Sequence, residues 1–464
     1  MRRIGLFGGI LLLGLAVSLI SRDTDPRLKK GSRSGERGGW IQVHLEGTPS
    51  EIGFQHGFLL ANEIADNFKA ISVEMAHEEK HPWSFFRKAA EEVFWPKVEQ
   101  EYRDEITGIV DGLKARGVKL DVWDVVALNA WLELPYYDKI HDKATGTNSN
   151  SAGPGEHCSA FVATGSYTKD GRVVIAHNNW TSYSSGERWN VIFEIVPAKG
   201  NRIIMDGAPG LIHSGDDFGV NSSGMMITET TISGFTGFDT AGVPEFVRAR
   251  KAMQYANSID DFARIMKDGN NGGYANNWLV ADRKTNEVAS LELGLKNVTL
   301  QRTKDGYFVG SNFPADPKLL KEETDFDPKD RSASQNARHE RWLQLMAENR
   351  GKIDVNAAQR FLGDHYDSYE KATAYNERTL CGHIETSPRG MGTWQPPHAP
   401  AGTVQNKAAD AAMAEKMTIS AALGHSCGRD FKAAEHLAKY PEFAWQREIL
   451  HDMTARGWTK FTAR

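Results

Sequence analysis

The chain has 464 residues, of which 40% are hydrophobic and 25% are charged. This length exceeds that of a typical single domain, so it favours two structural units and allows a large buried core. A formal net charge of −5 and the lack of a long lysine or arginine run argue against a nucleic-acid partner. The composition therefore favours a small-molecule partner.

The N-terminus has the pattern of an export signal. Arg2 and Arg3 precede an apolar run from Ile4 to Ile20, and charge resumes at Arg22. The run is only just shorter than the roughly 20 apolar residues that a membrane-spanning helix needs, so an uncleaved anchor is the alternative. We expect residues 1–21 to be a signal peptide or an anchor. The protein is then exported to the periplasm or secreted, with membrane proximity only through this segment.

The next part of the chain is predicted to be mostly helical. Residues 22–39 are basic and contain glycine and serine, which predicts a flexible tether. Residues 40–157 then carry apolar side chains at helical spacing, and Ser50 and Glu51 provide signals for the start of the first helix. We expect helices at residues 47–71, 85–114 and 122–134, followed by a polar loop at 143–157.

Short strands and turns dominate the chain after Cys158. An apolar strand at residues 160–162 is followed by a Lys-Asp-Gly turn and a returning strand at 172–176, which predicts a hairpin. From Ser334 onward the chain is predicted to be mostly helical again. The pattern alone supports the α+β class. Further strands are expected at residues 190–196, 202–205, 224–231, 276–282, 288–293, 298–302 and 307–314, with a helix at 245–267 and a Pro/Gly-rich loop at 390–402.

Cys158 is the most informative residue, because it follows a polar, glycine-rich run and begins the hairpin. A thiol with a pKa near 8.5 is only a few per cent ionised at neutral pH, whereas an α-amino group titrates near 8 and is a workable base. Cleavage between His157 and Cys158 would place both groups on one residue, which is the chemistry of an N-terminal nucleophile. A buried structural cysteine at the start of a strand is the alternative.

The stretch GEHCSAFVATGSYTKDGRVVIAHNNW, residues 155–180, resembles the N-terminal-nucleophile hydrolases and acyltransferases that include phospholipase-B-like proteins and penicillin acyltransferase. It is more distantly similar to the choloylglycine hydrolases. In the bile-salt-hydrolase branch an arginine, an asparagine and an aspartate stand where His177, Asn178 and Trp180 stand here. The Ala-His-Asn-x-Trp motif itself resembles the phospholipase-B-like branch. The resemblance implies a four-layer αββα sandwich over residues 158–464, preceded by a helical pro-segment at 40–157.

The same resemblance implies roles for the residues around Cys158. His177 would bond the thiol or orient the substrate carbonyl, with a strand-end histidine as the alternative. Thr231, which ends the stretch FGVNSSGMMITETT, and Asn312, in YFVGSNFPAD, would hold the oxyanion of the transition state. Arg338, in ASQNARHERWLQLM, would stabilise this group electrostatically, with surface solvation as the alternative. Asn178 and Trp180 complete the candidate catalytic set.

Two cysteines remain, Cys381 and Cys427, and they form either a disulfide, which an exported protein could keep oxidised, or two buried thiols. Together with His383 and His425 they could in principle bind a metal. The single-residue spacing within Cys381-Gly-His383 and within His425-Ser-Cys427 is unlike that of the usual zinc knuckle. We therefore expect neither a metal nor another cofactor.

These observations lead to one principal functional hypothesis and two alternatives. The principal hypothesis is a self-processing thiol hydrolase or acyltransferase that cleaves an acyl amide bond through Cys158, with the pro-segment retained on the catalytic chain. The first alternative is a phospholipase-B-like ester hydrolase of lipids. The second is a catalytically silent protein of the same fold that binds an acyl or lipid ligand.

Overall fold

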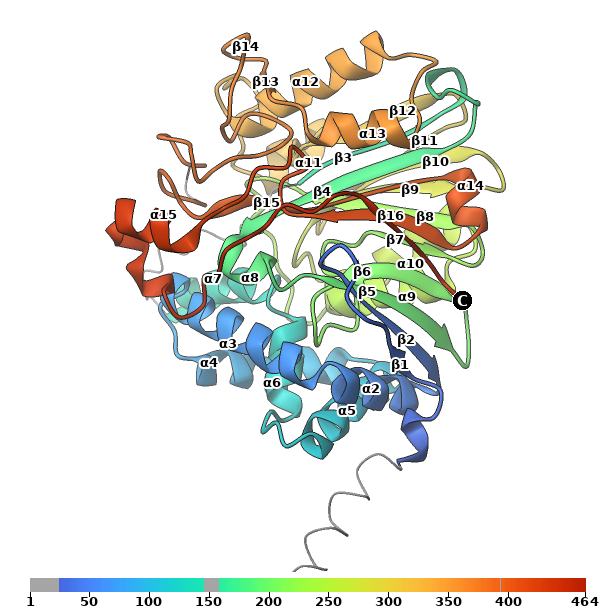
Figure 1. Cartoon of the computed structure of the whole chain (residues 1–464), viewed down its shortest axis with the longest axis vertical. Helices are drawn as coiled ribbons and strands as arrows, with labels where there is room; N and C mark the ends of the chain where they lie inside the picture. Colours follow the sequence, from blue (N-terminus) through green and yellow to red (C-terminus); the bar gives the residue numbers. More distant parts are fainter. Residues whose placement is uncertain (1–24, 146–157, 393) are drawn as a thin grey trace, which may run out of the picture.

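The computed structural model describes residues 25–145, 158–392 and 394–464, and the N-terminal segment 1–21 lies outside this part of the chain. Two large β-sheets pack face to face, and helices cover the outer face of each sheet (Figure 1). The predicted α+β class and the four-layer αββα sandwich are therefore confirmed. None of the helices within the described ranges is long and apolar enough to cross a membrane.

The first sheet has nine strands, in the order β1-β2-β5-β6-β7-β8-β9-β10-β11. Neighbouring strands are antiparallel except for β2 and β5, which are parallel. The strands are β1 (Ser32–Arg33), β2 (Ile41–Gly47), β5 (Val191–Pro197), β6 (Ile203–Gly207), β7 (Gly219–Asn221), β8 (Met225–Thr231), β9 (Asn276–Asp282), β10 (Glu287–Leu293) and β11 (Val298–Thr303).

The second sheet has six antiparallel strands, in the order β12-β3-β4-β15-β16-β17. Three of them follow Ser334, so the prediction of a mostly helical C-terminal part is wrong. These strands are rich in alanine, glycine and polar residues, which carry little of the branched and aromatic signal typical of strands. The strands are β3 (Ser159–Thr164), β4 (Val174–Ser182), β12 (Gly306–Gly310), β15 (Ala401–Asp410), β16 (Thr418–Leu423) and β17 (Thr459–Thr462), with a small separate pair β13 (Tyr366–Asp367) and β14 (Ala372–Thr373).

Strand alternation decides what each face of the second sheet contacts. Ala160 and Val162 of β3 belong to the apolar core between the two sheets, which also contains Ile192 of the first sheet. Phe161 and Ala163 point the other way and pack with the helices α12 (Ser334–Glu348) and α13 (Val355–Leu362). In Figure 1 these two helices lie at the top of the molecule. Both faces of β3 are buried, which accounts for its nearly continuous apolar sequence.

A larger set of helices covers the outer face of the nine-stranded sheet. Several predicted helices are broken in the structure. One predicted helix is interrupted at Leu60, and the next at a short π-helix followed by a 3₁₀ turn that contains Pro96. The third is interrupted before Ser258, whose side chain caps the helix that follows. The helices of this layer are α2 (Pro49–Leu59), α3 (Ala61–Glu78), α4 (Trp83–Ala89), α5 (Gln100–Ala115), α6 (Val122–Asn129), α7 (Leu134–Thr145), α9 (Glu245–Tyr255) and α10 (Ile259–Lys267).

The segment before Cys158 is less purely helical than predicted. Residues 25–39, expected to be a flexible tether, are tied to the fold, because β1 pairs with β2. Arg27 forms an ion pair with Asp111 at 2.8 Å, and its guanidinium lies 4.0 Å from the ring centroid of Phe54. The strand β2 is itself an internal strand of the nine-stranded sheet. The segment before Cys158 therefore supplies part of the sandwich as well as its helical cover.

The helices α2 and α5 cross at a contact that has room only for glycine. Gly53 and Gly57 of α2 face Gly108 and Gly112 of α5. A Cβ atom added at Gly57 would lie 2.0 Å from the carbonyl oxygen of Ile109, far inside contact distance. Because this obstacle is backbone, the neighbouring helix would have to move as a whole. The close approach of the two helices thus depends on these glycines.

We predict that Gly57→Ala lowers the stability of the protein. Alanine favours a helix over glycine by about 1 kcal/mol, but overpacking against backbone costs about 1–3 kcal/mol or more at a rigid contact. We expect the thermal unfolding midpoint, measured by circular dichroism, to fall by several degrees. Gly35→Ala is the matched control, since nothing lies within 4 Å of an added Cβ there. Equal midpoints for the two variants would contradict this reading of the helix crossing.

Candidate active site

Cys158, immediately before β3, is held through both of its backbone polar groups. Its backbone N–H donates to Oδ1 of Asn312 at 3.1 Å, and its carbonyl oxygen accepts from Nη1 of Arg338 at 2.5 Å. The residue is fully buried. By strand alternation its side chain lies on the same face as Ala160, between the two sheets. The position of the sulfur is therefore set by backbone contacts from two distant parts of the chain.

Two potential proton acceptors lie near the sulfur of Cys158. One ring nitrogen of His177, from β4, and one carboxylate oxygen of Glu229, from β8, lie within 4.8 Å of this sulfur and of each other. Sγ of Cys158 also lies 3.7 Å from Oδ1 of Asn179, and the hydroxyl of Tyr274 donates to Glu229 at 3.0 Å. Glu229 and Asn179 were not in the sequence-based set. The second asparagine of AHNNW was the available signal for Asn179, and the Glu229-Thr230-Thr231 run that ends FGVNSSGMMITETT was the available signal for Glu229.

His177 is neutral in this environment. Burial lowers its pKa well below the usual value, and the positive charge of Lys407 adds to this effect. Nδ1 of His177 lies 3.8 Å from Asp216, too far for a hydrogen bond. Asp216 is bound to Lys407, which also contacts Asp206 at 3.1 Å. A neutral imidazole keeps one lone pair that can accept a proton, but the lowered pKa makes His177 a weaker base than an exposed histidine. Neither of its ring nitrogens has a hydrogen-bond partner within the described residues.

Asn178 and Trp180 lie on the face of β4 opposite His177, where they support the backbone next to Cys158. Oδ1 of Asn178 accepts from the backbone N–H of Ser159 at 2.9 Å and from the indole N–H of Trp180 at 3.0 Å. Nδ2 of Asn178 donates to the carbonyl of Leu380 at 2.6 Å. The ring of Trp180 lies 4.4 Å from the guanidinium carbon of Arg338. Both residues therefore support the backbone around Cys158 from the face opposite its sulfur.

Asn312 clamps the start of β3 to the end of β8. It follows β12 and has a φ of +63°, a left-handed conformation that asparagine tolerates better than most residues. Its Oδ1 accepts from both Cys158 and Arg338, which fixes the orientation of the amide. Its Nδ2 donates to the carbonyl of Thr231 at 2.9 Å. The hydroxyl of Thr231 has no hydrogen-bond partner among the described residues.

Arg338 connects the outer helical layer to this site. Its guanidinium donates to the hydroxyls of Ser334 at 2.9 Å and Ser159 at 3.0 Å, and to Oδ1 of Asn312 at 2.9 Å, in addition to the Cys158 carbonyl. Burial lowers the pKa of Arg338 to about 9, which still leaves it charged at neutral pH. The sequence-based alternative of a solvated surface arginine is therefore wrong, since Arg338 is fully buried.

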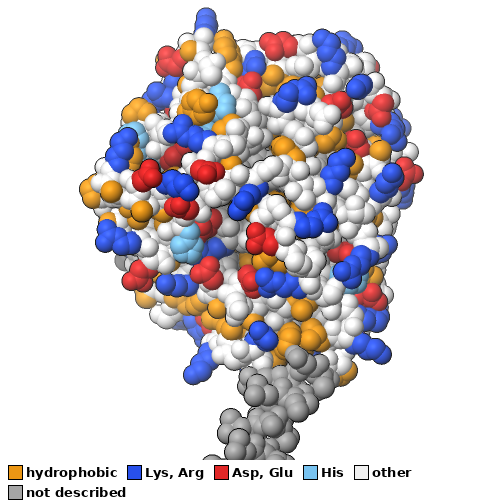
Figure 2. Space-filling model, in the orientation of Figure 1, with side chains coloured by type: hydrophobic (Ala, Val, Ile, Leu, Met, Phe, Trp, Pro, Cys, Tyr) orange, Lys and Arg blue, Asp and Glu red, His pale blue; other side chains and the backbone are white. Residues whose placement is uncertain are grey.

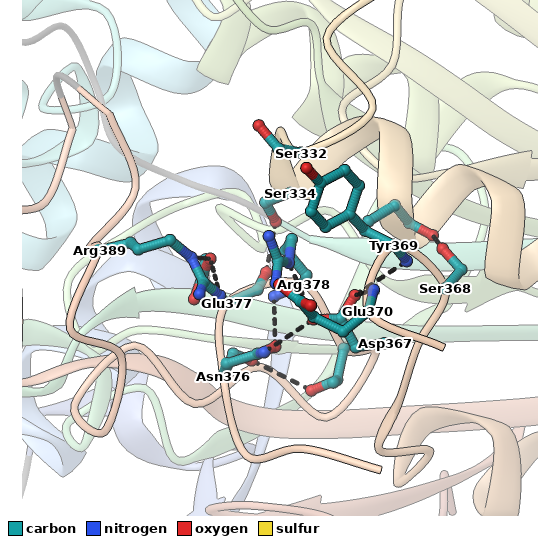
Figure 3. A network of polar contacts seen from close by, with 12 residues as sticks. Ser332, Ser334, Asp367, Ser368, Tyr369, Glu370, Asn376, Glu377, Arg378 and Arg389 are labelled. Carbon is teal, nitrogen blue, oxygen red and sulfur yellow. Dashed lines mark hydrogen bonds and ion pairs between the residues drawn. The ribbon is translucent and has the colours of Figure 1, made fainter. Parts of the chain in front are cut away.

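A second polar network adjoins Ser334. The hydroxyl of Ser334 donates to the carbonyl of Glu377 at 2.5 Å, and Figure 3 shows the surrounding contacts. There Arg378 binds Asp367 at 2.8 Å and Glu370 at 2.7 Å. These bonds order the loop between β14 and β15. The helix α12 is thus attached to this loop as well as to Cys158.

We predict that Arg338→Lys destabilises the protein. A lysine offers three donors from one point and cannot reach all four acceptors, and each buried acceptor left unsatisfied costs about 1–3 kcal/mol. The unfolding midpoint in urea or heat should fall clearly. Arg350→Lys provides the control, because Arg350 makes only exposed contacts to Ser166 and Tyr167 and the change should stay within about 0.5 kcal/mol. Equal effects of the two substitutions on the unfolding midpoint would show that stability does not depend on the several hydrogen bonds of the Arg338 guanidinium.

The remaining sequence-based residues have simple outcomes. All three cysteines, which the structure describes, are free, so of the two alternatives for Cys381 and Cys427 the structure has the thiols, with their sulfurs within 4.8 Å of each other. Cys381 is a buried thiol and Cys427 an exposed one. His157 lies outside the described residues. On the face drawn in Figure 2, acidic and basic side chains are interspersed.

Comparisons with known proteins show a family likeness. The phospholipase B family model matches residues 60–461. The chain is 32% identical over 154 residues to putative phospholipase B-like 2 of Bos taurus, which covers 30% of this chain and 26% of that protein. It is 26% identical over 293 residues to phospholipase-B 81 of Drysdalia coronoides, covering 58% and 51%. An uncharacterized protein of Archaeoglobus fulgidus is 27% identical over 252 residues, covering 53% and 42%.

These matches cover about half or less of each relative's length. Among solved structures, a variant of conjugated bile acid hydrolase from Clostridium perfringens matches with a TM-score of 0.27 and 10% sequence identity, over 57% of this chain and 80% of that one. A likeness this low supports no argument about function. The assignment to a family rests on the sequence match over residues 60–461.

Proposed function

Because the chain belongs to the phospholipase B family, we propose that it is a self-processing thiol hydrolase or acyltransferase that cleaves an acyl amide bond. The observation that supports this proposal is the surroundings of Cys158. Its backbone N–H donates to Asn312 and its carbonyl accepts from Arg338, while atoms of His177 and Glu229 lie within 4.8 Å of its sulfur. A structural cysteine would need none of these polar groups.

The first proposed step is cleavage of the chain itself. The sulfur of Cys158 attacks the carbonyl carbon of His157, the bond to the Cys158 nitrogen breaks, and a thioester with a free α-amine results. Water then hydrolyses the thioester, leaving a carboxylate on His157 and the thiol on Cys158. In the uncut chain the nitrogen of Cys158 is an amide and cannot act as base. We assign the first proton transfer to His177 or Glu229, the groups nearest the sulfur.

The second step is turnover of substrate by the cut protein. The new α-amine, with a pKa near 8, takes the proton of the thiol while the sulfur attacks the acyl carbon of the substrate. The amine then returns the proton to the leaving amine, and water or another acceptor removes the acyl group. The hydroxyl of Thr231 and Nδ2 of Asn179, which have no hydrogen-bond partner among the described residues, and the second N–H of Asn312 Nδ2 are donors suited to the oxyanion.

We expect the pro-segment to remain bound after cleavage. The strand β2 pairs with β5 along seven residues, from Ile41 opposite Val191 to Gly47 opposite Pro197. The helices before Cys158 also share one apolar core with α9 and α10 from the catalytic part. Separating the two pieces would expose this core to water, which is strongly unfavourable.

Ester hydrolysis of phospholipids is the second candidate function. It is favoured by the names of the family and of the matched relatives in Bos taurus and Drysdalia coronoides. The same nucleophile and oxyanion donors would serve an ester, with an alkoxide in place of an amine as leaving group. A catalytically silent acyl- or lipid-binding protein is the third candidate, and it needs neither cleavage at Cys158 nor a reactive thiol.

We predict that the purified protein consists of two chains, one ending at His157 and one beginning at Cys158. Mass spectrometry should give the two masses under denaturing conditions, and a native column should give one species. Cys158→Ala should remain one inactive chain, whereas Cys158→Ser should be cut slowly, because a hydroxyl is the poorer nucleophile. Chromogenic acyl amides and acyl esters then distinguish the first two candidate functions. A fully active but uncut chain would overturn the N-terminal-nucleophile mechanism in favour of a Cys158–His177 pair.

We further propose that the protein is exported and loses its first residues. The apolar run from Ile4 to Ile20 follows two arginines and ends in small residues. The mature protein in the periplasmic or secreted fraction should begin near residue 22, as N-terminal sequencing will show. An exported product that still starts at Met1 would indicate an anchor instead.

A further inference from the structure

Four side chains that commonly bind metals converge outside the candidate active site. Cys381, His383, Cys427 and His365 each place one ligand atom within 4.8 Å of the other three. Cys381 and His383 lie between β14 and β15, His365 follows α13, and Cys427 follows β16. The sequence pairs Cys427 with His425 by proximity, whereas the structure brings His365 to this group. No pattern in the sequence links His365 to the two cysteines.

The distances within the group agree with the edges of a tetrahedral zinc site. Nε2 of His365 lies 3.2 Å from Nε2 of His383, and Sγ of Cys427 lies 3.6 Å from the same nitrogen. Zinc bonds of about 2.05 Å to nitrogen and about 2.3 Å to sulfur, at tetrahedral angles, give edges of about 3.3 Å and about 3.6 Å. A ring nitrogen of imidazole forms one hydrogen bond, in the plane of the ring, so hydrogen bonding does not account for both neighbours of Nε2 of His383. A cation shared by the three atoms would account for them.

The surrounding residues orient His383 as a metal ligand. Its Nδ1 lies 2.9 Å from Oε1 of Glu385. Because a carboxylate accepts, Nδ1 carries the proton and Nε2 presents its lone pair to the group. The ring of His425 stacks on His383 at 3.9 Å, and its Nε2 instead faces the hydroxyl of Tyr183 at 2.9 Å. His425 therefore supports the ring of His383 and is not one of the four ligands.

The geometry points to a structural zinc site formed by His365, Cys381, His383 and Cys427. Two thiolates and two imidazoles are the donor set that zinc favours, whereas magnesium and calcium select oxygen ligands. Four protein ligands leave no open coordination position, so the ion supports the fold and does not activate water. A disulfide between the two cysteines would explain their proximity but not the convergence of the two imidazoles. Cys427 is exposed, which gives the ion a route of entry.

The zinc ion would link loops that contact the residues supporting the candidate active site. The carbonyl of Leu380, next to Cys381, accepts from Nδ2 of Asn178. On the other side of Leu380, Arg378 anchors the same loop through the network of Figure 3. The ion would add a link from this loop to Cys427 after β16. This inference does not depend on the proposed amide or ester chemistry.

The test is metal analysis of the full-length protein purified without chelator. We expect about one zinc ion per chain, falling by at least ~10-fold in Cys427→Ser and in His365→Ala. Cys158→Ser is the matched control and should keep its zinc, because it removes a thiol outside the group. Cobalt(II) added to chelator-treated wild-type protein should produce thiolate-to-metal absorption and the intense visible bands of tetrahedral cobalt. Chelation should also lower the unfolding midpoint of the wild type and of Cys158→Ser, but not that of Cys427→Ser.

Several results would overturn the zinc site. They are a wild-type protein with neither bound zinc nor cobalt bands, a Cys427→Ser protein with undiminished zinc, and a Cys381–Cys427 disulfide found by thiol titration and peptide mapping. The cobalt experiment uses the wild-type chain, so it decides the question even if a variant fails to fold. The loss of zinc binding is measured independently of chain cleavage and of hydrolysis, so failure here is distinguishable from failure of the proposed function.

Discussion

The buried charge of Arg338 is the constraint on which the geometry around Cys158 depends. A guanidinium removed from water must keep its donors satisfied, or the cost of desolvation is not recovered. Here the acceptors are a carbonyl, an amide oxygen and two hydroxyls, and the face of Trp180 lies against the charge. These acceptors come from β3, from the loop after β12 and from α12. None of these elements can shift without leaving part of the charge unpaired.

The alternation of side chains along β3 and β4 places the residues near the sulfur of Cys158 on one face and the residues that support the backbone around it on the other. Cys158, His177 and Asn179 share the face between the two sheets, while Asn178 and Trp180 share the face toward α12. Two adjacent strands paired in a continuous antiparallel register therefore supply both sets. A register shift of one residue would exchange the two faces and bury the supporting side chains between the sheets.

Both ends of the structure are linked to its centre by pairings that are distant in sequence. The strand β2 enters the nine-stranded sheet from the segment before Cys158 and binds β5. The C-terminal strands β15, β16 and β17 complete the other sheet, with β15 beside β4 and its candidate site residues. Of the cysteine–histidine group, Cys427 follows β16, whereas Cys381 and His383 precede β15 and His365 follows α13. The site itself thus lies where middle and late parts of the chain meet.

The sequence by itself determined the class of the fold, the position of Cys158 at the start of a strand, and the family likeness. These features rest on local patterns: the hairpin after Cys158, the alternating strands up to residue 310, and the short motif at residues 176–180. Two further stretches, YFVGSNFPAD and ASQNARHERWLQLM, indicated Asn312 and Arg338 through the family resemblance, and the structure brings both residues to Cys158. Local patterns sufficed because strand propensity and turn chemistry act over only a few residues.

Only the tertiary structure decided the rest, because the missing information was contact between distant residues. The strands β15 to β17 consist largely of small and polar residues, and neighbouring strands, not propensity, make them strands. Only the placement of β8 in the folded protein brings the carboxylate of Glu229 near the sulfur of Cys158. His365 has no sequence relation to Cys381 or Cys427, and folding alone places its imidazole against that of His383. Local sequence patterns describe only neighbouring residues, whereas these groups form when the chain closes on itself.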